Sequence, residues 1–371
     1  MLNGHPILQF GTSRFLQAHV DLFVSEGEGA LGGITVVQGT DNPASTRRAQ
    51  ALADGYEVVI RGLSAGRPVD LRKTCRSVRE VLHARHDWAA LRGRVRGPVQ
   101  LIVSNTGDSG WTLAAEDGPD LLAGHAAAPA SFPARLLVLL HDRWQAQPAA
   151  EFTLLPCELV TRNGDALRDL VLGLASDWRC PPAFVDWLSS HVVWANSLVD
   201  RIVSEALEPA GAVAEPYALW AIEVQPGLQL PCRHPAIVLT DDLASHERLK
   251  LFLLNLGHTL LAELWLRGSL AADMTVLQAM HEPRLRQPLE QAWQQEVLPV
   301  FDALGQGEAA RAYLVDLRDR LLNPFLAHLL ADIAQNHAQK KLRRLQPVVE
   351  LAQSLLPALG QPLLRATLAA H

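Results

Sequence analysis

The chain has 371 residues, of which 49% are hydrophobic and 19% are charged, a composition typical of a folded globular protein and unlike a disordered one. Its formal net charge of −6 gives no support to a nucleic-acid or anionic-membrane partner, because such surfaces need clustered Lys and Arg. A chain of this length usually folds as two domains.

The cysteine spacing, the N-terminal sequence and the most apolar segment bear on metal binding and on location in the cell. No two of the four cysteines form a CxxC pair, so we expect no metal site and scattered reduced thiols. The first nine residues lack a basic stretch followed by a long apolar run, so no signal peptide is expected. The most apolar long segment, 249–266, is interrupted by Lys, Asn, His and Glu, unlike a membrane span. A cytoplasmic protein with no membrane partner is predicted.

Short apolar runs alternate with helical patterns through the first half of the chain. Strands are predicted at 6–10, 34–38, 56–60, 69–78, 99–103 and 152–155. Helices are predicted at 15–25, after Pro43 and at 133–145. This alternation is typical of a parallel sheet with helices on its faces, so we expect an α/β, Rossmann-like, doubly wound domain.

The second half of the chain reads as mainly helical. From about residue 204 only 236–239 resembles a strand. Helices are predicted at 249–267, 285–304, 309–322, 325–339 and 342–356. We therefore expect a dinucleotide-binding domain over 1–203 and a mainly α-helical substrate and catalytic domain over 204–371.

The turn after the first strand is a candidate cofactor site. Gly11, Thr12, Ser13, Arg14 and Phe15 lie where the backbone of a dinucleotide fold approaches a pyrophosphate at the start of a helix. Only the first glycine of the usual three is present, so an ordinary connection between strand and helix is the alternative.

The end of the second strand bears on the choice of cofactor. Asp41 is placed to hold an adenosine ribose, which would favour NAD. Arg47 and Arg48 follow it and are equally suited to a phosphate, with solvated loop charges as the alternative. The sequence therefore leaves NAD and NADP both open.

Polar residues follow two later strands. Ser104, Asn105 and Thr106 come directly after the strand at 99–103, and Glu158 follows the strand at 152–155. Ligands of doubly wound folds bind outside the carboxyl ends of strands, so we expect these residues at the cofactor site. Polar turn chemistry explains the same residues without a ligand.

The most informative group is Lys250, Asn255 and His258. On an α-helix these residues occupy an arc of about 140°, and nearly everything around them is Leu or Phe, which predicts a buried helix. Burial favours the neutral form of a lysine, which is the form that a general base needs. The alternative is a lysine that extends to solvent beside a paired Asn and His in the core.

A second amide candidate is Asn196, which follows an apolar run. Its NH₂ group could stabilise a developing alkoxide, as oxyanion-hole amides do. A capping or turn role is the alternative.

Together these segments resemble the polyol-specific long-chain dehydrogenases, the mannitol dehydrogenase family. The resemblance covers most of the chain and is closest to the members that reduce the keto sugar acid tagaturonate. Its most specific motif is a Lys followed by Asn five residues later and His three residues after that. The other matching segments are 7–11, 104–106, 155–159, 163–168, 198–203, 215–216, 220–223 and 323–324.

The resemblance implies a metal-independent, NAD(P)-dependent enzyme that transfers a hydride to or from a secondary alcohol. It implies that Lys250 is the general base, that Asn196 and Asn255 hold the alkoxide oxygen, and that His258 positions the substrate. Ser13 departs from the glycine that many relatives have in the cofactor turn.

The resemblance also points to a substrate pocket near Lys340. Asp332 and Gln335 stand where an Arg and a His are expected in mannitol dehydrogenases, which favours a sugar acid over mannitol. Lys340, Arg343 and Arg344 are candidates to bind its carboxylate, with a solvated helix face as the alternative for the two arginines. A neutral polyol or ketose, and a catalytically silent relative that binds a sugar acid or nucleotide, remain alternatives. We expect a monomer or small homo-oligomer with a small-molecule partner.

Overall fold

A computed structural model describes residues 5–39, 43–107, 110–124, 127–268 and 270–369. The chain divides into two compact units. The first unit comprises Met1–Val59, Leu71–Ala214 and Ala218–Leu243, and the second comprises Ile60–Asp70, Glu215–Tyr217 and Ala244–His371.

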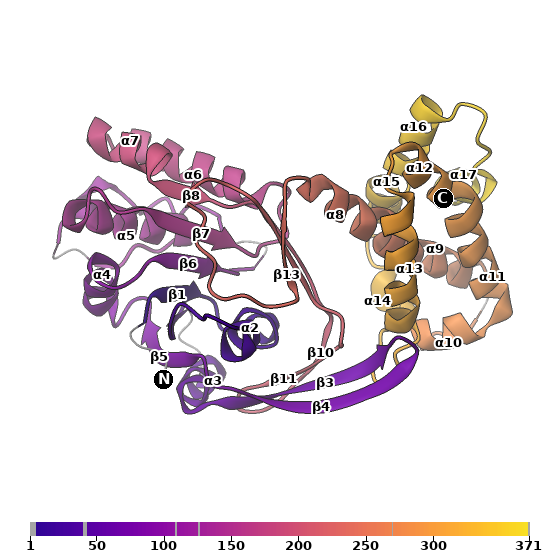
Figure 1. Ribbon diagram of the computed structural model, residues 1–371, viewed down its shortest axis with the longest axis horizontal. Coiled ribbons are helices and arrows are strands. Elements are labelled where there is room, and N and C mark those ends of the chain that lie inside the picture. Colours follow the sequence, from indigo (N-terminus) through magenta and orange to yellow (C-terminus); the bar gives the residue numbers. More distant parts are fainter. Residues whose placement is uncertain (1–4, 40–42, 108–109, 125–126, 269, 370–371) are drawn as a thin grey trace. The chain divides into compact units, whose positions relative to one another are not determined.

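The first unit is built on a six-stranded sheet whose paired strands are all parallel (Figure 1). Across the sheet the strands are β5 (Val78–His83), β2 (Ile34–Gln38), β1 (Ile7–Phe10), β6 (Leu101–Ser104), β7 (Phe152–Pro156) and β8 (Val192–Trp194). The chain order reverses between β1 and β6, which defines a doubly wound sheet. The prediction of a Rossmann-like α/β fold is confirmed.

The central strands of the sheet are mostly apolar, with isolated Gln, Thr or Ser residues, because helices cover both faces. Every residue of β1, β2, β6 and β7 is buried. The helices of this unit are α1 (Arg14–Gln17), α2 (Val20–Glu26), α3 (Pro43–Asp54), α4 (Trp88–Arg96), the 3₁₀ turn η1 (Pro119–Leu122), α5 (Phe132–Ala146), α6 (Asn163–Asp177) and α7 (Pro182–Ser190). Helices α4 to α7 share one apolar core with β1, β6 and β7 (Figure 1).

Two predictions for the first half need correction. The helix expected at 15–25 is two helices, α1 and α2, separated at residues 18–19. The strand expected at 69–78 is also two elements, β4 (Arg67–Cys75) and the start of β5, which belong to different sheets. β4 lies beside β3 (Tyr56–Ser64) in a four-stranded sheet, so the chain leaves one sheet and enters another within three residues.

Residues 204–243 are richer in strands than the sequence predicts. They contain β10 (Val203–Ala206), β11 (Ala212–Ala214), β12 (Leu219–Glu223) and β13 (Ile237–Thr240). β10 and β11 complete the sheet of β3 and β4, and β12 and β13 form a three-stranded sheet with β9 (Ser197–Asp200). Because this pairing ties most of 204–243 to the first unit, the structure divides the chain near residue 243, later than the expected boundary at 203/204.

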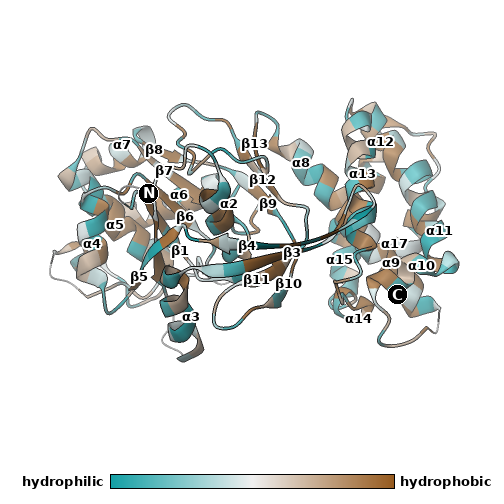
Figure 2. Ribbon diagram, turned by 60° about the horizontal axis from the view of Figure 1, so that its bottom comes forward, coloured by the Kyte–Doolittle hydropathy of each residue, from teal (hydrophilic) through white to brown (hydrophobic). Residues whose placement is uncertain are grey.

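The second unit is mainly helical, and its helices carry hydrophilic and hydrophobic residues along their length (Figure 2). They are α8 (Leu243–Leu249), the π-helical turn η2 (Lys250–Asn255), α9 (Leu256–Arg267), α10 (Val276–His281), α11 (Pro283–Gln291), the π-helical turn η3 (Ala292–Val297), α12 (Leu298–Ala303), α13 (Gly307–Leu321), α14 (Leu330–Ile333), α15 (His337–Arg344), α16 (Gln346–Leu355) and α17 (Pro362–Ala369). The helix expected at 325–339 is wrong, because the chain after Leu321 is irregular until the short α14.

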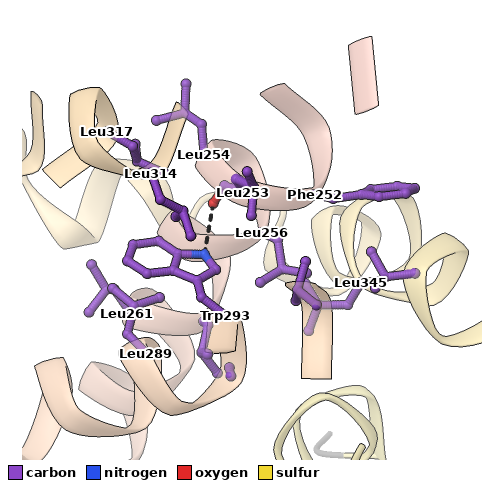
Figure 3. Close-up of a cluster of buried hydrophobic side chains, with 14 of the residues drawn as sticks. Phe252, Leu253, Leu254, Leu256, Leu261, Leu289, Trp293, Leu314, Leu317 and Leu345 are labelled. Carbon is purple, nitrogen blue, oxygen red and sulfur yellow. Dashed lines mark hydrogen bonds between the residues drawn. The ribbon is translucent and has the colours of Figure 1, made fainter. Parts of the chain in front are cut away.

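The continuous helix Leu243–Arg267 is long and apolar enough, by length and composition alone, to cross a membrane. Two thirds of its apolar window (67%) is buried inside the structure, which is also how a core helix of a folded domain behaves. Its apolar side chains pack into the core of the second unit around Trp293 (Figure 3).

Candidate active site

The turn after β1 requires glycine at its first position. Gly11 has a φ of +122°, which disfavours any residue with a Cβ. A Cβ there would also lie 2.6 Å from the carbonyl oxygen of Asn105, which follows the neighbouring strand β6. The turn is therefore packed directly against the end of β6, at the point where the strand order reverses.

Side chains fix this turn in place. Ser13 caps α1, because its Oγ accepts a hydrogen bond from Leu16 N at 3.2 Å and donates to Asn105 Oδ1 at 3.1 Å. Gln17 Nε2 donates to the Thr12 carbonyl oxygen at 3.0 Å. Phe15 stacks on the buried His19 with ring centroids 4.6 Å apart.

Glu158 links the ends of β6 and β7. Its carboxylate accepts hydrogen bonds from Ser104 Oγ, Thr106 N and Thr106 Oγ1, each at 3.0 Å. Asn105 Nδ2 donates to the Cys157 carbonyl oxygen at 3.0 Å. The four polar residues predicted at these two strand ends are thus brought together as one network.

Asn196 lies at the next strand end and is completely buried. Its Nδ2 donates to Glu223 Oε2 at 2.7 Å and to Asp165 Oδ2 at 3.3 Å, and its Oδ1 accepts from Asp165 N at 3.1 Å. Both amide hydrogens are engaged by carboxylates, so in this arrangement Asn196 holds the first turn of α6 against β12.

The residues around the turn fit a dinucleotide. Two guanidinium groups, those of Arg14 and Arg48, lie beside this turn. Arg48 Nη1 donates to the Thr12 carbonyl oxygen at 3.5 Å. Burial and the positive charge of Arg48 lower the pKa of Arg14. Arg14 also pairs with the exposed Glu208 at 2.8 Å. The Nε of Arg48 is buried and has no partner within the described part of the chain, which fits a group that binds an anionic ligand.

A cleft of about 720 Å³ opens at the ends of β2 and β5. Gln38 at the end of β2, His83 at the end of β5 and Gln50 of α3 line it. Its place at the carboxyl edge of a parallel sheet suits the adenosine of a dinucleotide. Asp41, the predicted ribose-binding residue, lies outside the described residues.

In the second unit, Lys250 and Asn255 are the first and last residues of the π-helical turn η2. In such a turn hydrogen bonds join residues five apart, and Leu256 N donates to the Leu251 carbonyl oxygen in this way. Lys250 and Asn255 are therefore about one turn apart, whereas the α-helical arc assumed from the sequence separates them. Isolated π-turns occur frequently at functional sites.

Packing against a second π-turn holds η2. Trp293, in η3, donates from its indole Nε1 to the carbonyl oxygen of Leu253 at 3.2 Å (Figure 3). The indole reaches this carbonyl only because residue 257 is glycine: a Cβ on Gly257 would lie 2.7 Å from Trp293 Cζ2. The shape of the candidate catalytic turn thus depends on Trp293 and Gly257.

The sequence predicts a fully buried helix, but in the structure one side of it is only partly buried. Lys250 and Asn255 are half-buried, while His258 is buried. The ring of His258 lies edge-on to His328, with centroids 5.1 Å apart, and burial lowers the pKa of His328. Two imidazoles therefore lie together here, His258 on the helix and His328 in the irregular segment before α14.

Lys340, the predicted substrate residue, lies half-buried on α15, a helix that packs against α9. Its Nζ donates to the Ile333 carbonyl oxygen at 2.7 Å. One turn later, Arg344 Nη1 donates to Thr259 Oγ1 at 3.1 Å. Arg343 is exposed, which agrees with the solvated alternative for that residue alone.

Sequence reasoning missed three of these residues: Glu223, Trp293 and His328. A signal existed for Glu223, which lies in a segment that matches the family. No local signal marks Trp293 as the partner of the turn, because 40 positions of chain separate it from Leu253.

The doubly wound sheet, the glycine turn at its reversal point and a helical unit that presents Lys, Asn and His define a nucleotide-dependent oxidoreductase fold. Residues 5–230 match the model of the mannitol dehydrogenase Rossmann domain, and residues 242–360 match that of the mannitol dehydrogenase C-terminal domain. The chain belongs to the mannitol dehydrogenase family.

Curated relatives in this family are named altronate oxidoreductase. One from Klebsiella pneumoniae is 32% identical over 381 residues, covering 95% of this chain and 76% of that protein. One from Yersinia pestis is 33% identical, covering 93% and 75%, and one from Halalkalibacterium halodurans is 30% identical, covering 92% and 69%. The resemblance noted from the sequence is confirmed.

Solved structures agree on the fold. A substrate-free D-sorbitol dehydrogenase matches with a TM-score of 0.75 at 18% identity, covering 94% of this chain and 76% of that one. Pseudomonas fluorescens mannitol 2-dehydrogenase, solved in a ternary complex with NAD and D-mannitol, matches with a TM-score of 0.73 at 18% identity, covering 98% and 78%.

Proposed function

We propose that this protein is an NAD(P)-dependent oxidoreductase that interconverts tagaturonate, a keto sugar acid, and its aldonate altronate. The family membership and the altronate oxidoreductase relatives support a sugar-acid or polyol oxidoreductase acting on a CH–OH group. The observation that carries the proposal is the π-turn η2, which sets a lysine and an amide one turn apart in the C-terminal family domain.

The first unit would hold the cofactor. The Gly11–Ser13 turn and Arg48 suit the pyrophosphate, and the cleft beside Gln38 and His83 suits the adenosine. The bound nicotinamide ring supplies or accepts the hydride. NAD is the proposed cofactor, in keeping with the NAD-bound mannitol 2-dehydrogenase that shares the fold, and NADP is the second option.

The second unit would supply proton transfer. In the direction of oxidation Lys250 Nζ removes the hydroxyl proton of the aldonate while the carbon gives up its hydride, and in reduction it returns the proton to the same oxygen. The Asn255 amide donates a hydrogen bond to this oxygen, whose negative charge grows in the transition state. His258, held edge-on to His328, positions the substrate.

Unlike Asn255, Asn196 must give up an existing hydrogen bond before it can contact the alkoxide. The family resemblance gives it a second hydrogen bond to the alkoxide. Its NH₂ group would first have to exchange its bond to Glu223 or Asp165 for one to the substrate. We therefore assign the alkoxide contact to Asn255 before Asn196.

The test is a substrate panel with a matched set of variants. Oxidation of NADH and NADPH is followed with tagaturonate, fructuronate, fructose and smaller keto acids. We expect turnover with tagaturonate, and in Lys250→Ala a loss of about 10²- to 10⁴-fold in kcat with nucleotide affinity unchanged. Lys73→Ala is the control, because Lys73 lies in the first unit and pairs with Glu26.

Each other outcome identifies an alternative. Turnover with neutral ketoses alone would assign a polyol substrate, and nucleotide binding without any turnover would assign a silent relative. Full activity in Lys250→Ala would refute its role as the base. A small homo-oligomer and a cytoplasmic location remain predictions for gel filtration and cell fractionation.

A further inference from the structure

Two half-buried cations on α15, Lys340 and Arg344, have no carboxylate partner among the described residues. They are four residues apart, so they share one face of the helix. Their hydrogen bonds go to neutral oxygens, those of the Ile333 carbonyl and the Thr259 hydroxyl.

Neither cation forms an ion pair with a carboxylate anywhere in the described residues, whereas the adjacent Lys341 does. Lys341 pairs with Glu263 at 3.4 Å, and the same carboxylate is also engaged by His337 at 2.8 Å and by Arg267. Glu263 is therefore already shared among three partners. Glu263 pairs with Lys341 and not with Lys340 or Arg344, and Asp332, the other nearby acid in the described part of the chain, forms no ion pair with either of them.

This arrangement is unfavourable in the absence of an anion. Like charges four residues apart on a helix repel each other, and partial burial removes water that would otherwise solvate them. Burial is the main cause that lowers the pKa of Lys340, and the charge of Arg344 adds to it. Burial and the charge of Arg343 lower the pKa of Arg344 in the same way. Among the described residues, no acidic group contributes to either shift.

The pair lies next to the candidate catalytic turn. Thr259, which holds Arg344, donates its hydroxyl to the carbonyl oxygen of Asn255 at 2.9 Å. The charge of Lys340 acts on His328, whose ring contacts His258. An anionic group held by the pair would therefore lie beside the face of the helix that carries Asn255 and Thr259, four residues apart.

We propose that Arg344, with Lys340, binds the carboxylate of the substrate and makes the enzyme selective for sugar acids over neutral sugars. The inference rests on the function proposed above and names the residue that determines its substrate class. The planar guanidinium of Arg344 can donate two parallel hydrogen bonds to a carboxylate, and its bond to Thr259 sets its orientation beforehand.

The test compares two substrates that differ only in the group at the chain end. Tagaturonate carries a carboxylate where tagatose carries a CH₂OH group. In Arg344→Met we expect kcat/KM for tagaturonate to fall about 10- to 100-fold, the range for a hydrogen bond to a charged group, while the value for tagatose stays within about twofold. Arg344→Lys should recover part of the loss, because it restores the charge without the fork.

Arg343→Met is the matched control, since it removes the same charge from the neighbouring, exposed position. It should leave the ratio of the two kcat/KM values unchanged. An unchanged ratio in Arg344→Met, or an equal change in Arg343→Met, would overturn the proposal while leaving the oxidoreductase function standing.

A binding measurement separates this failure from failure of the proposed function. If the wild-type protein turns over neither substrate, calorimetric titration of the NAD-loaded protein with altronate decides. Binding that Arg344→Met weakens about 10-fold or more, and Arg343→Met does not, supports the carboxylate site in a protein without catalysis. Absence of altronate binding to the wild type overturns the site.

Discussion

The carboxyl edge of the parallel sheet and the side of the helical unit where α15 packs on α9 (called the helical face) are both rich in polar groups. Most of the polar groups described at the sheet edge are paired, whereas two cations on the helical face lack a carboxylate partner in the described chain. At the sheet edge, Glu158 accepts three hydrogen bonds, and Asn196 has both amide hydrogens engaged. On the helical face, Lys340 and Arg344 lack a carboxylate partner within the described residues, and the helix itself departs from α-geometry at Lys250.

The difference separates groups that build a site from groups that act in it. A buried polar group with all its partners present stabilises the fold, so its removal is expected to reduce stability. A charge or a helical turn that is unfavourable in isolation is retained where a ligand or a reaction compensates for it. The predictions below test whether the two regions divide in this way.

The largest effect is expected at Asn255. Asn255→Ala removes the amide that we assign to the developing alkoxide, and kcat should fall about 10²- to 10³-fold with little change in the unfolding midpoint. Steady-state kinetics and thermal unfolding on the same preparation check this. A loss of stability that accounts for the loss of activity would place Asn255 with the structural groups instead.

Glu158 should behave in the opposite way. Glu158→Ala leaves the hydroxyls of Ser104 and Thr106 and the Thr106 N–H without their acceptor, so unfolding in urea should be easier by about 2–3 kcal/mol. Glu158→Gln keeps an acceptor oxygen and should lose less. If Glu158→Ala unfolds like the wild type but no longer binds nucleotide, the carboxylate acts on the cofactor and the division between the regions fails at this residue.

The sheet edge could largely be predicted from the sequence because its signals are local. The apolar runs, such as 34–38, show where each strand ends, and the carboxyl ends of parallel strands lie at one edge of the sheet. Gly11, Ser104 and Glu158 could therefore be placed at this edge without knowledge of which strands pair. What failed there was non-local. The short strand β11 is stabilised by pairing with β3, which lies more than a hundred residues earlier in the chain, and β12 by pairing with β9 and β13.

The helical face was predictable in its residue types and not in its geometry. The spacing of Lys250, Asn255 and His258 singles out one helix as the candidate for catalysis. The π-turn that sets the first two residues one turn apart is held by Trp293, and nothing in residues 250–258 reveals it. Likewise, the sequence treated Arg343 and Arg344 alike, and only the packing of α15 on α9 distinguishes the exposed from the half-buried side chain.

A smaller effect is expected from the indole that supports η2. Trp293→Phe keeps most of the packing and removes the donor to the Leu253 carbonyl oxygen, a loss of about 1 kcal/mol. We expect kcat to fall up to about 10-fold, with KM for the cofactor unchanged, since the turn would no longer hold Lys250 and Asn255 in place. Trp265→Phe is the control, because Trp265 Nε1 donates to the Ala271 carbonyl oxygen, away from η2. Equal effects from both substitutions would show that the loss of a tryptophan, and not of the turn, is responsible.

The smallest effect concerns a titratable group in the first unit that is kept neutral. His19 is fully buried between Phe15, Phe23 and Trp220, and burial lowers its pKa to about 3. Because the unfolded chain takes up this proton near pH 6.5, stability is fully present above about pH 7 and is lost as the pH falls. Between pH 7 and 5.5 the loss from His19 is about 1 kcal/mol.

Urea unfolding at several pH values measures that slope in wild type, in His19→Phe and in His281→Gln, which alters an exposed histidine. His19→Phe loses the bond to the Leu219 carbonyl oxygen at every pH, so its absolute stability is not the readout. Its slope should be shallower by about 1 kcal/mol over this range, while His281→Gln should keep the wild-type slope. An unchanged slope in His19→Phe would mean that the imidazole accepts its proton within the fold. The first unit would then tolerate an uncompensated charge as the helical face does, and the contrast between the two regions would be one of degree.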